Sequence, residues 1–186
     1  MHARPDEELL GAWAAGDRDA GRELYQRYAE RVTRFFARKT DDELPDLVQR
    51  TFLKCLEAAK QGTVGNAAGF LFAIARNELY DQFRRRRDVD PAVTSLADVR
   101  TGLSSQLARH ERERVLHDAL AKLPLDSQLA LELYYWDDLA MSDVARALAT
   151  TESAAINRIH RARAQLREML PPDLAQAFET RPLPVG

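Results

Sequence analysis

The sequence is poor in the residues that disulfide-bonded, β-rich and membrane-spanning proteins need. It holds one cysteine, Cys55, so no disulfide can form within the chain. Glycine and proline number eight each among 186 residues, too few for a turn-rich all-β chain. No apolar run approaches the roughly 18 residues of a membrane-spanning helix, and the charged N-terminal stretch does not resemble a signal peptide. We therefore expect a cytoplasmic protein in a reducing compartment, without membrane insertion.

The residue patterns of metal centres and of phosphate-binding enzymes are missing as well. The histidines have no cysteine or carboxylate constellation around them, and no P-loop or glycine-rich phosphate cradle occurs. We expect no metal, no cofactor and no enzyme activity. Cys55 falls on an apolar stripe, which predicts buried packing rather than redox sensing.

Charge is sorted into blocks, although the net charge is only −2. Segment 76–87 carries arginines that outnumber its acids, segment 158–167 carries arginines and no acid, and segment 41–46 is acidic. Local basic clusters attract nucleic acid whatever the total charge of a chain. Hydrophobic residues make up 45% and charged residues 30%, as in globular proteins. The abundance of Ala, Leu, Arg and Glu favours helix.

Apolar residues recur at helical spacing in the first half of the chain. The stripes are Leu24, Tyr28, Val32 and Phe35; Leu44, Val48, Phe52, Cys55 and Ala59; and Leu71, Ala75, Leu79 and Phe83. With a short preceding helix that ends at Gly16, they predict helices at 6–15, 19–39, 42–60 and 66–87. Gly62 and Gly65 indicate a loop before the last of these.

The periodicity is lost over 89–108, where Pro91, Gly102 and scattered Ser and Thr indicate a flexible linker. Helical patterns resume near 109, with breaks at Pro124, Asp138 and Thr150 and an end at Pro171 and Pro172. The predicted fold is all-α without a β-sheet. Its parts are a helical domain at 1–88, the linker at 89–108, a second helical domain at 109–175 and a tail at 176–186.

Residues 141–169 show the pattern of a helix-turn-helix. Val144 and Leu148 give the first helix an apolar side, Ala145 is small where two helices must cross closely, and Thr151 can cap the second helix. The expected buried stripe of the second helix is Ala155, Ile159, Ala162, Leu166 and Met169. Its opposite side then carries Ser153, Ala154, Asn157, Arg158 and Arg161, which include side chains that reach phosphates and base edges. The pattern alone also fits a helical hairpin with a solvated basic face.

Two distant segments resemble the same family, the extracytoplasmic-function (ECF) sigma factors of bacterial RNA polymerase. Residues 120–170 resemble the fourth region of that family, best at Leu123-Pro124, Val144-Ala145 and 158–163. Upstream, DLVQRTF (46–52) and FLFAIARN (70–77) with the arginines 84–87 resemble the second region, and 16–28 resembles its beginning. The resemblance covers about residues 6–170, in the family's order.

The resemblance implies two partners, core RNA polymerase and promoter DNA. The second region of the family grips the polymerase clamp helices and opens the −10 element, and its fourth region sits on the flap and reads the −35 element. The segment between them threads into the polymerase. Polymerase contacts are therefore expected from Glu43, Asp46, Gln49 and Arg50. DNA contacts are expected from Arg76, Asn77, Tyr80, Arg84, Arg85, Arg87, Ser153, Asn157, Arg158 and Arg161.

The chemistry of the second-region residues suits these roles. Arg76, Tyr80 and Arg84 share one helix face at i, i+4 spacing. Arginines hold phosphates, and an aromatic ring can stack on an unpaired base. Asn77 matches a family position close to the melted bases, and an amide can read a base edge. The 61–69 loop matches the family loop that captures a flipped base.

The chain departs from the family on the expected polymerase-binding surface. Pro45 and Arg50 stand where the family usually carries acid, which predicts weaker clamp binding. Phosphorylation of the neighbouring Thr51 by a Ser/Thr kinase would add about −1.5 to −2 charges, and we hypothesise that this restores the negative patch. The kinase must then reach a residue on the shoulder of the Val48–Phe52 stripe, so a plain helix-surface threonine is the alternative. An anti-sigma factor is the other regulator considered.

Ala149 stands at the usual glycine of the helix-turn-helix turn, which costs about 1 kcal/mol if φ is positive there. Two other functions remain open at this point. One is a helix-turn-helix regulator that does not act as a sigma subunit, which leaves the matches at 46–52 and 70–77 unexplained. The other is an interaction protein built from helical hairpins that does not bind DNA.

Overall fold

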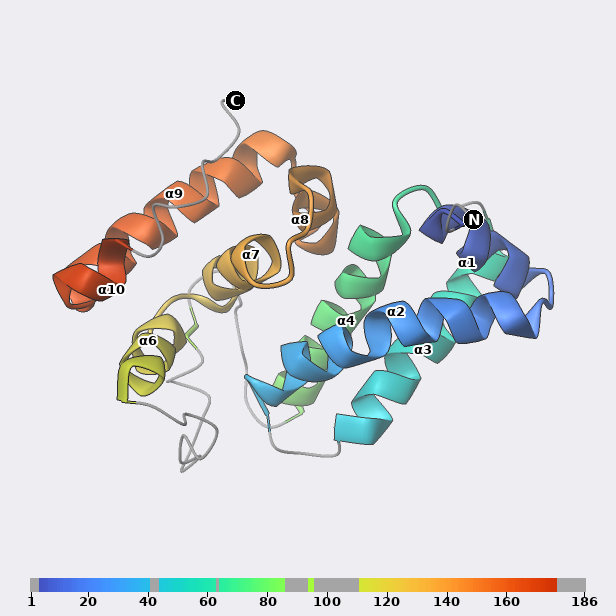
Figure 1. Cartoon of the computed structure of the whole chain (residues 1–186), viewed down its shortest axis with the longest axis horizontal. Coiled ribbons are helices and arrows are strands. Elements are labelled where there is room, and N and C mark those ends of the chain that lie inside the picture. The colour runs from blue at the N-terminus through green and yellow to red at the C-terminus, as the bar shows by residue number, and fades with distance from the viewer. Residues whose placement is uncertain (1–3, 41–43, 63, 86–93, 96–110, 177–186) are drawn as a thin grey trace. The chain divides into compact units, whose positions relative to one another are not determined.

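A computed structural model describes residues 4–40, 44–62, 64–85, 94–95 and 111–176. The chain divides into two compact units, residues 1–82 and 83–186, which are described one by one (Figure 1). Over the described residues the chain forms nine helices and no strand, so the all-α prediction is confirmed. The division after residue 82 lies inside a helix, and the predicted functional boundaries at 88 and 109 stay predictions.

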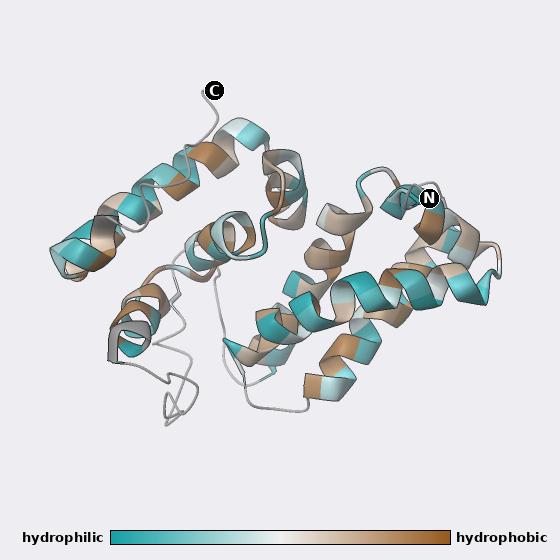
Figure 2. Cartoon of the chain, in the orientation of Figure 1, coloured by the Kyte–Doolittle hydropathy of each residue, from teal (hydrophilic) through white to brown (hydrophobic). Residues whose placement is uncertain are grey.

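The first unit is built on four helices close to the predicted ones. They are α1 (Asp6–Ala14), α2 (Arg18–Ala37), α3 (Leu44–Lys60) and α4 (Ala67–Arg84). Helices α1, α2 and α3 pack on one another, and α4 joins α2 where the Phe72 and Phe35 rings lie 5.8 Å apart. Apolar and polar bands alternate along these helices (Figure 2), as expected for one buried side on each.

A glycine and an aspartate make the corner between α1 and α2. Gly16 adopts a φ of 105°, and the N–H groups of Gly16 and Asp17 donate to the carbonyls of Trp13 and Ala12, each at 3.0 Å. This pairing is the glycine-terminated helix end that the sequence predicts. The Asp17 carboxylate then caps α2, and the hydrogen bond from the Ala20 N–H is the main reason that its pKa is lowered.

An ion-pair network holds α1 against α2. The Arg27 guanidinium lies 2.5 Å from the Asp6 carboxylate and 2.8 Å from the Arg4 carbonyl oxygen. Asp6 also accepts a hydrogen bond from the Tyr28 hydroxyl. The pKa of Arg27 is raised, chiefly by its hydrogen bond with Asp6. The N-terminal helix is therefore fixed by polar as well as apolar contacts.

The second unit holds five described helices besides the end of α4. They are α6 (Glu111–Ala121), α7 (Leu125–Tyr135), α8 (Met141–Ala147), α9 (Glu152–Met169) and α10 (Pro172–Gln176). Helix α9 packs on α6, α7, α8 and α10. The predicted break near Asp138 is present, with a φ of 51° at that residue. The sequence predicted only that the last helix ends at Pro171 and Pro172. In the structure Pro172 is also the first residue of a further short helix, α10.

Two residues of the predicted linker are paired with the start of α7. The Leu125 N–H donates to the Thr94 carbonyl oxygen at 3.0 Å, and Ser95 forms an isolated antiparallel bridge with Pro124. Ser95 is buried. This part of the linker is therefore held by backbone hydrogen bonding, which the loss of periodicity in the sequence did not predict.

The turn between α8 and α9 forms as the helix-turn-helix pattern predicts. The N–H groups of Ala149 and Thr150 donate to the carbonyls of Arg146 and Ala145, at 3.0 and 2.9 Å, and Ala149 takes a φ of 52°. The Thr151 hydroxyl accepts from the Ala154 N–H at 3.2 Å and caps α9. Four residues of the predicted buried stripe are buried, namely Ala155, Ile159, Ala162 and Leu166. Met169 is 36% exposed, so its place in the stripe is corrected, and Leu170 is buried instead.

Replacing Ala149 with glycine should raise the free energy of unfolding of the second unit by up to about 1 kcal/mol, because glycine adopts a positive φ without a Cβ clash. Thermal unfolding followed by circular dichroism measures the change. Ala164→Gly is the matched control at an exposed helical position of α9, where glycine should cost about 1 kcal/mol. A loss of stability in both variants would contradict the strain at Ala149.

Candidate nucleic-acid interface

The outer side of α9 is the first candidate DNA-binding surface. Ser153, Asn157 and Arg161 are exposed and follow one another at i, i+4 spacing. The Arg161 Nε donates to the Asn157 carbonyl oxygen at 3.4 Å, and His160 is exposed beside it. Hydroxyl, amide and guanidinium groups in one row on the second helix of a helix-turn-helix can reach phosphates and base edges together.

Arg158 does not lie with this row. Its Nη1 is 3.2 Å from the Asp126 Oδ2 on α7, and the two side chains are only 26% and 9% exposed. The sequence prediction that Arg158 faces away from the protein is therefore corrected. Because Asp126 is buried, its charge needs this partner, and the pair ties the recognition helix to α7.

The second candidate surface lies on α4. Asn77 and Arg84 are exposed there, as is Arg85 directly after the helix, whereas Arg87 lies outside the described residues. Tyr80 is only 4% exposed, and the Arg76 guanidinium covers its ring at 4.5 Å from the centroid. The prediction that Tyr80 stacks on an unpaired base is corrected, because a buried ring cannot offer a free face.

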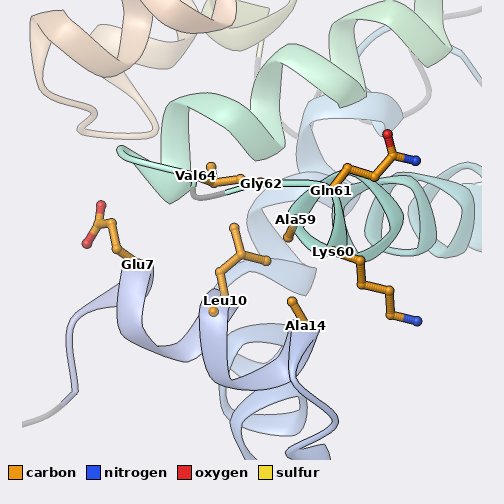
Figure 3. A pocket seen from close by; sticks show the side chains of 9 residues that line it. Glu7, Leu10, Ala14, Ala59, Lys60, Gln61, Gly62 and Val64 are labelled. Carbon is orange, nitrogen blue, oxygen red and sulfur yellow. The ribbon is translucent and has the colours of Figure 1, made fainter.

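A cavity of about 420 Å³ opens beside the loop that precedes α4 (Figure 3), a volume within the range of ligand pockets. Its lining comes from α1, the end of α3 and the loop: Glu7, Leu10, Gly11, Ala14, Ala59, Lys60, Gln61, Gly62 and Val64. Glu7 accepts from the Ala67 N–H at 3.2 Å. At Asn66 the φ is 65° and the side chain accepts from the Gly69 N–H at 2.8 Å. Polar contacts thus fix the start of α4 beside the cavity.

The expected polymerase-binding surface on α3 differs in charge from its prediction. Asp46 and Gln49 are exposed, and Glu43 lies outside the described residues. Arg50 is half-buried, with its Nε 3.0 Å from the Glu78 Oε2 on α4. The charge of Arg50 is therefore balanced inside the unit instead of standing alone toward a partner. Leu53, which the sequence patterns did not single out, is 48% exposed on α3.

Thr51 is fully buried, which corrects the phosphorylation hypothesis. Its exposed fraction is 0%, and its hydroxyl donates to the Leu47 carbonyl oxygen at 2.7 Å. Leu47 and Cys55, four residues to either side, are also 0% exposed. The centre of the buried stripe therefore runs through Thr51 and not along its flank, so the shoulder that a kinase needs is closed.

Burial of Cys55 agrees with its predicted packing role. Loss of solvent raises the pKa of the Cys55 thiol to about 12, so the thiol stays protonated at neutral pH. Across the part of the chain that the structure describes, no three His, Cys, Asp or Glu side chains gather as a metal site would require. A search of those same residues finds no helix with the length and apolar character needed to cross a membrane.

Two buried carboxylates with roles in these surfaces were missed in the sequence. Glu78 is 5% exposed between the α3 cations Arg50 and Lys54, and Asp126 is 6% exposed beside Arg158. A signal existed for Glu78, because an acid there interrupts the arginine-rich end of α4 close to the apolar stripe. Nothing in the local sequence connects Asp126 with a residue 32 positions later.

Comparison with known proteins assigns both units. The family model for sigma-70 region 2 matches residues 24–89, and that for sigma-70 region 4 matches residues 113–166. The chain is 34% identical to the ECF RNA polymerase sigma factor EcfG of Rhodopseudomonas palustris, over 74% of this chain and 76% of EcfG. It resembles the structure of CnrH bound to the cytosolic domain of CnrY, with a TM-score of 0.65 and 25% identity over 90% of this chain and 98% of CnrH. It also shares the fold of the sigma factor RpoE of Bartonella quintana, solved with the anti-sigma factor NepR (TM-score 0.59, 21% identity, 80% and 94% of the two chains).

Replacing Thr51 with glutamate should lower the free energy of unfolding of the first unit by at least about 2 kcal/mol, because it buries a carboxylate without a partner. Chemical denaturation measures the loss. Thr51→Val removes only the hydroxyl and should cost no more than about 1 kcal/mol. A glutamate variant as stable as wild type, with stronger polymerase binding, would restore the phosphorylation hypothesis.

The Asp126–Arg158 pair should show a coupling energy of about 2 kcal/mol in a double-mutant cycle of the two alanine variants, because both single changes remove the same largely buried ion pair. Thermal unfolding of the four proteins gives this value. Arg161→Ala is the control on the same helix, and its exposed side chain should leave stability within about 0.5 kcal/mol of wild type. Additive single effects would mean that the pair is not a structural tie.

Proposed function

This chain belongs to the ECF family of sigma factors, and we propose that its two units divide promoter recognition between the −10 and −35 elements. As a sigma factor it binds core RNA polymerase and promoter DNA and directs the initiation of transcription. The observation that carries the division is that each unit exposes an asparagine beside arginines on a single helix, Asn77 on α4 and Asn157 on α9.

The second unit reads the −35 element through α9 in this proposal. Asn157 contacts a base edge, because an amide can pair with adenine in the major groove. Ser153 and Arg161, one turn to either side, hold the neighbouring phosphates. Arg158 supports this surface indirectly, because its guanidinium pairs with Asp126 and so holds α9 against α7. The polymerase flap is the expected partner of the same unit.

The first unit grips the polymerase clamp and opens the −10 element. Asp46, Gln49 and Arg50 on α3 are the proposed clamp-facing residues. Asn77 reads a melted base, and Arg84 and Arg85, at the end of α4 and directly after it, hold the DNA backbone, which suits the exposure of all three side chains. The 61–69 loop and the cavity beside it accept the flipped base, since a formed pocket recovers the cost of unstacking.

The other functions considered for this sequence explain less of the chain. A helix-turn-helix regulator that is not a sigma subunit would account for the match at 113–166 and leave that at 24–89 without a role. We infer a protein that acts in the cytoplasm and catalyses no reaction. An anti-sigma factor, such as the one bound to the RpoE relative, is the regulator that we favour, because Thr51 is closed to a kinase.

Run-off transcription with core RNA polymerase and a genomic promoter library tests the proposal. We expect transcripts that depend on this chain and start downstream of a shared pair of −35 and −10 sequences. Binding to DNA without polymerase, and no transcript in its presence, would favour the regulator instead.

Asn77→Ala and Asn157→Ala should change which promoters are used, at the −10 and −35 elements respectively, by about 1–3 kcal/mol of discrimination at one base. Arg161→Ala should weaken binding to all promoters alike and reduce the salt slope by about 1. Competitive transcription from randomised promoters and salt titrations measure the two effects. Gln165→Ala, at an exposed site near the end of α9, is the control, and an equal effect there would reject the assignment of Asn157.

A further inference from the structure

We propose that Glu78 is a positioning residue for promoter opening, which holds the DNA-facing helix α4 at a fixed angle to the polymerase-facing helix α3. The inference rests on the proposed function of these two helices. Its physical basis is a three-residue charge bridge, which consists of Glu78 on α4 and Arg50 and Lys54 on α3.

The geometry of the charge bridge is that of a tie between helices. The Arg50 Nε lies 3.0 Å from one carboxylate oxygen of Glu78, and the Lys54 ammonium contacts the other. Arg50 and Lys54 are one helical turn apart, so the carboxylate spans two successive turns of α3. A contact to both oxygens restricts rotation of α4 about its own axis more than a single ion pair does.

Burial makes this tie hard to replace by water. The Glu78 side chain is 5% exposed, whereas Arg50 and Lys54 are 39% and 53% exposed. A buried carboxylate must keep its partners, while the two cations are partly solvated without it. Removing the carboxylate should therefore disturb the orientation of α4 more than removing either cation.

The position of Glu78 in α4 links the tie to DNA binding. Glu78 directly follows Asn77, and the Arg76 guanidinium is already fixed over the Tyr80 ring. The Glu78 side chain turns inward to α3 while Asn77 is exposed, so the tie sets the direction in which Asn77 points. Since α3 carries the proposed clamp-binding residues, docking on the polymerase and placement of Asn77 share one rigid connection.

The bridge also explains why an arginine can stand at position 50, on a surface where acid was expected. The ion pair with Glu78 neutralises the charge of Arg50 within the unit. Replacing Arg50 with glutamate would set two carboxylates against each other. It should therefore damage promoter opening even though it adds the acid that the polymerase surface lacks.

The test measures open-complex formation per polymerase-bound chain, by 2-aminopurine fluorescence in the −10 element, at a temperature where every variant is folded. Glu78→Gln keeps the shape of the side chain and removes its charge. In the protein that keeps Arg50, Glu78→Gln should reduce open-complex formation about tenfold. This is the factor expected from the loss of one charged hydrogen bond. Affinity for core polymerase should stay unchanged, which separates positioning from loss of the fold.

The decisive measurement repeats Glu78→Gln in an Arg50→Glu background. There the same change should increase opening, because it removes a repulsion between two carboxylates and leaves the introduced carboxylate free to pair with Lys54 one turn away. Glu57→Gln, at an exposed acid on the same α3, is the matched control and should do nothing in either background.

Three results would decide against the proposal. They are an equal effect of Glu78→Gln in both backgrounds, no effect in either, or the same effect from Glu57→Gln. Wild-type protein that fails to start transcription with core polymerase would instead refute the proposed function, whatever the variants do.

Discussion

A buried carboxylate paired with an arginine across two helices is the constraint that α4 and α9, the two helices proposed to face DNA, share. Glu78 joins α4 to α3, and Asp126 joins α9 to α7. Both carboxylates are almost fully buried, so the ion pair with the arginine offsets part of the cost of removing their charge from water. Apolar contacts bring the helices together, whereas these directional contacts fix which side of each helix faces outward.

Six of the arginines described above fall into two groups with different roles. Arg27, Arg50 and Arg158 are at least partly buried and form ion pairs with Asp6, Glu78 and Asp126, respectively. Arg84, Arg85 and Arg161 are exposed and can meet phosphates. A near-neutral net charge is compatible with DNA binding, because charge is distributed unevenly and acids such as Asp6, Glu78 and Asp126 pair with arginines inside the units and not on the exposed basic sides.

The helices and most of the core were predictable, because each helix repeats its apolar side within a window of the sequence. The left-handed turn at Ala149 and the cap at Thr151 were also predictable, because both depend on residues close together in the sequence. Tyr80, Thr51 and Arg158 were misassigned, because their fates depend on what lies across from them. The position of Thr51 along its helix predicts only that it lies near the edge of the apolar stripe. Whether the side chain is buried depends on how the helix packs against other helices. The pairing of Thr94 with Leu125 likewise has no local signature.

The isolation of Cys55 has a practical consequence for studying the two units separately. It is the single thiol of the chain, it is 0% exposed, and it lies in the first unit. A thiol-specific reagent can therefore react with the native protein only during openings that expose α3. In the regime where such openings reclose quickly, the labelling rate reports the local opening equilibrium of the first unit and is silent about the second. The chain thus carries a built-in chemical probe of local unfolding in the first unit, with no engineered cysteine required.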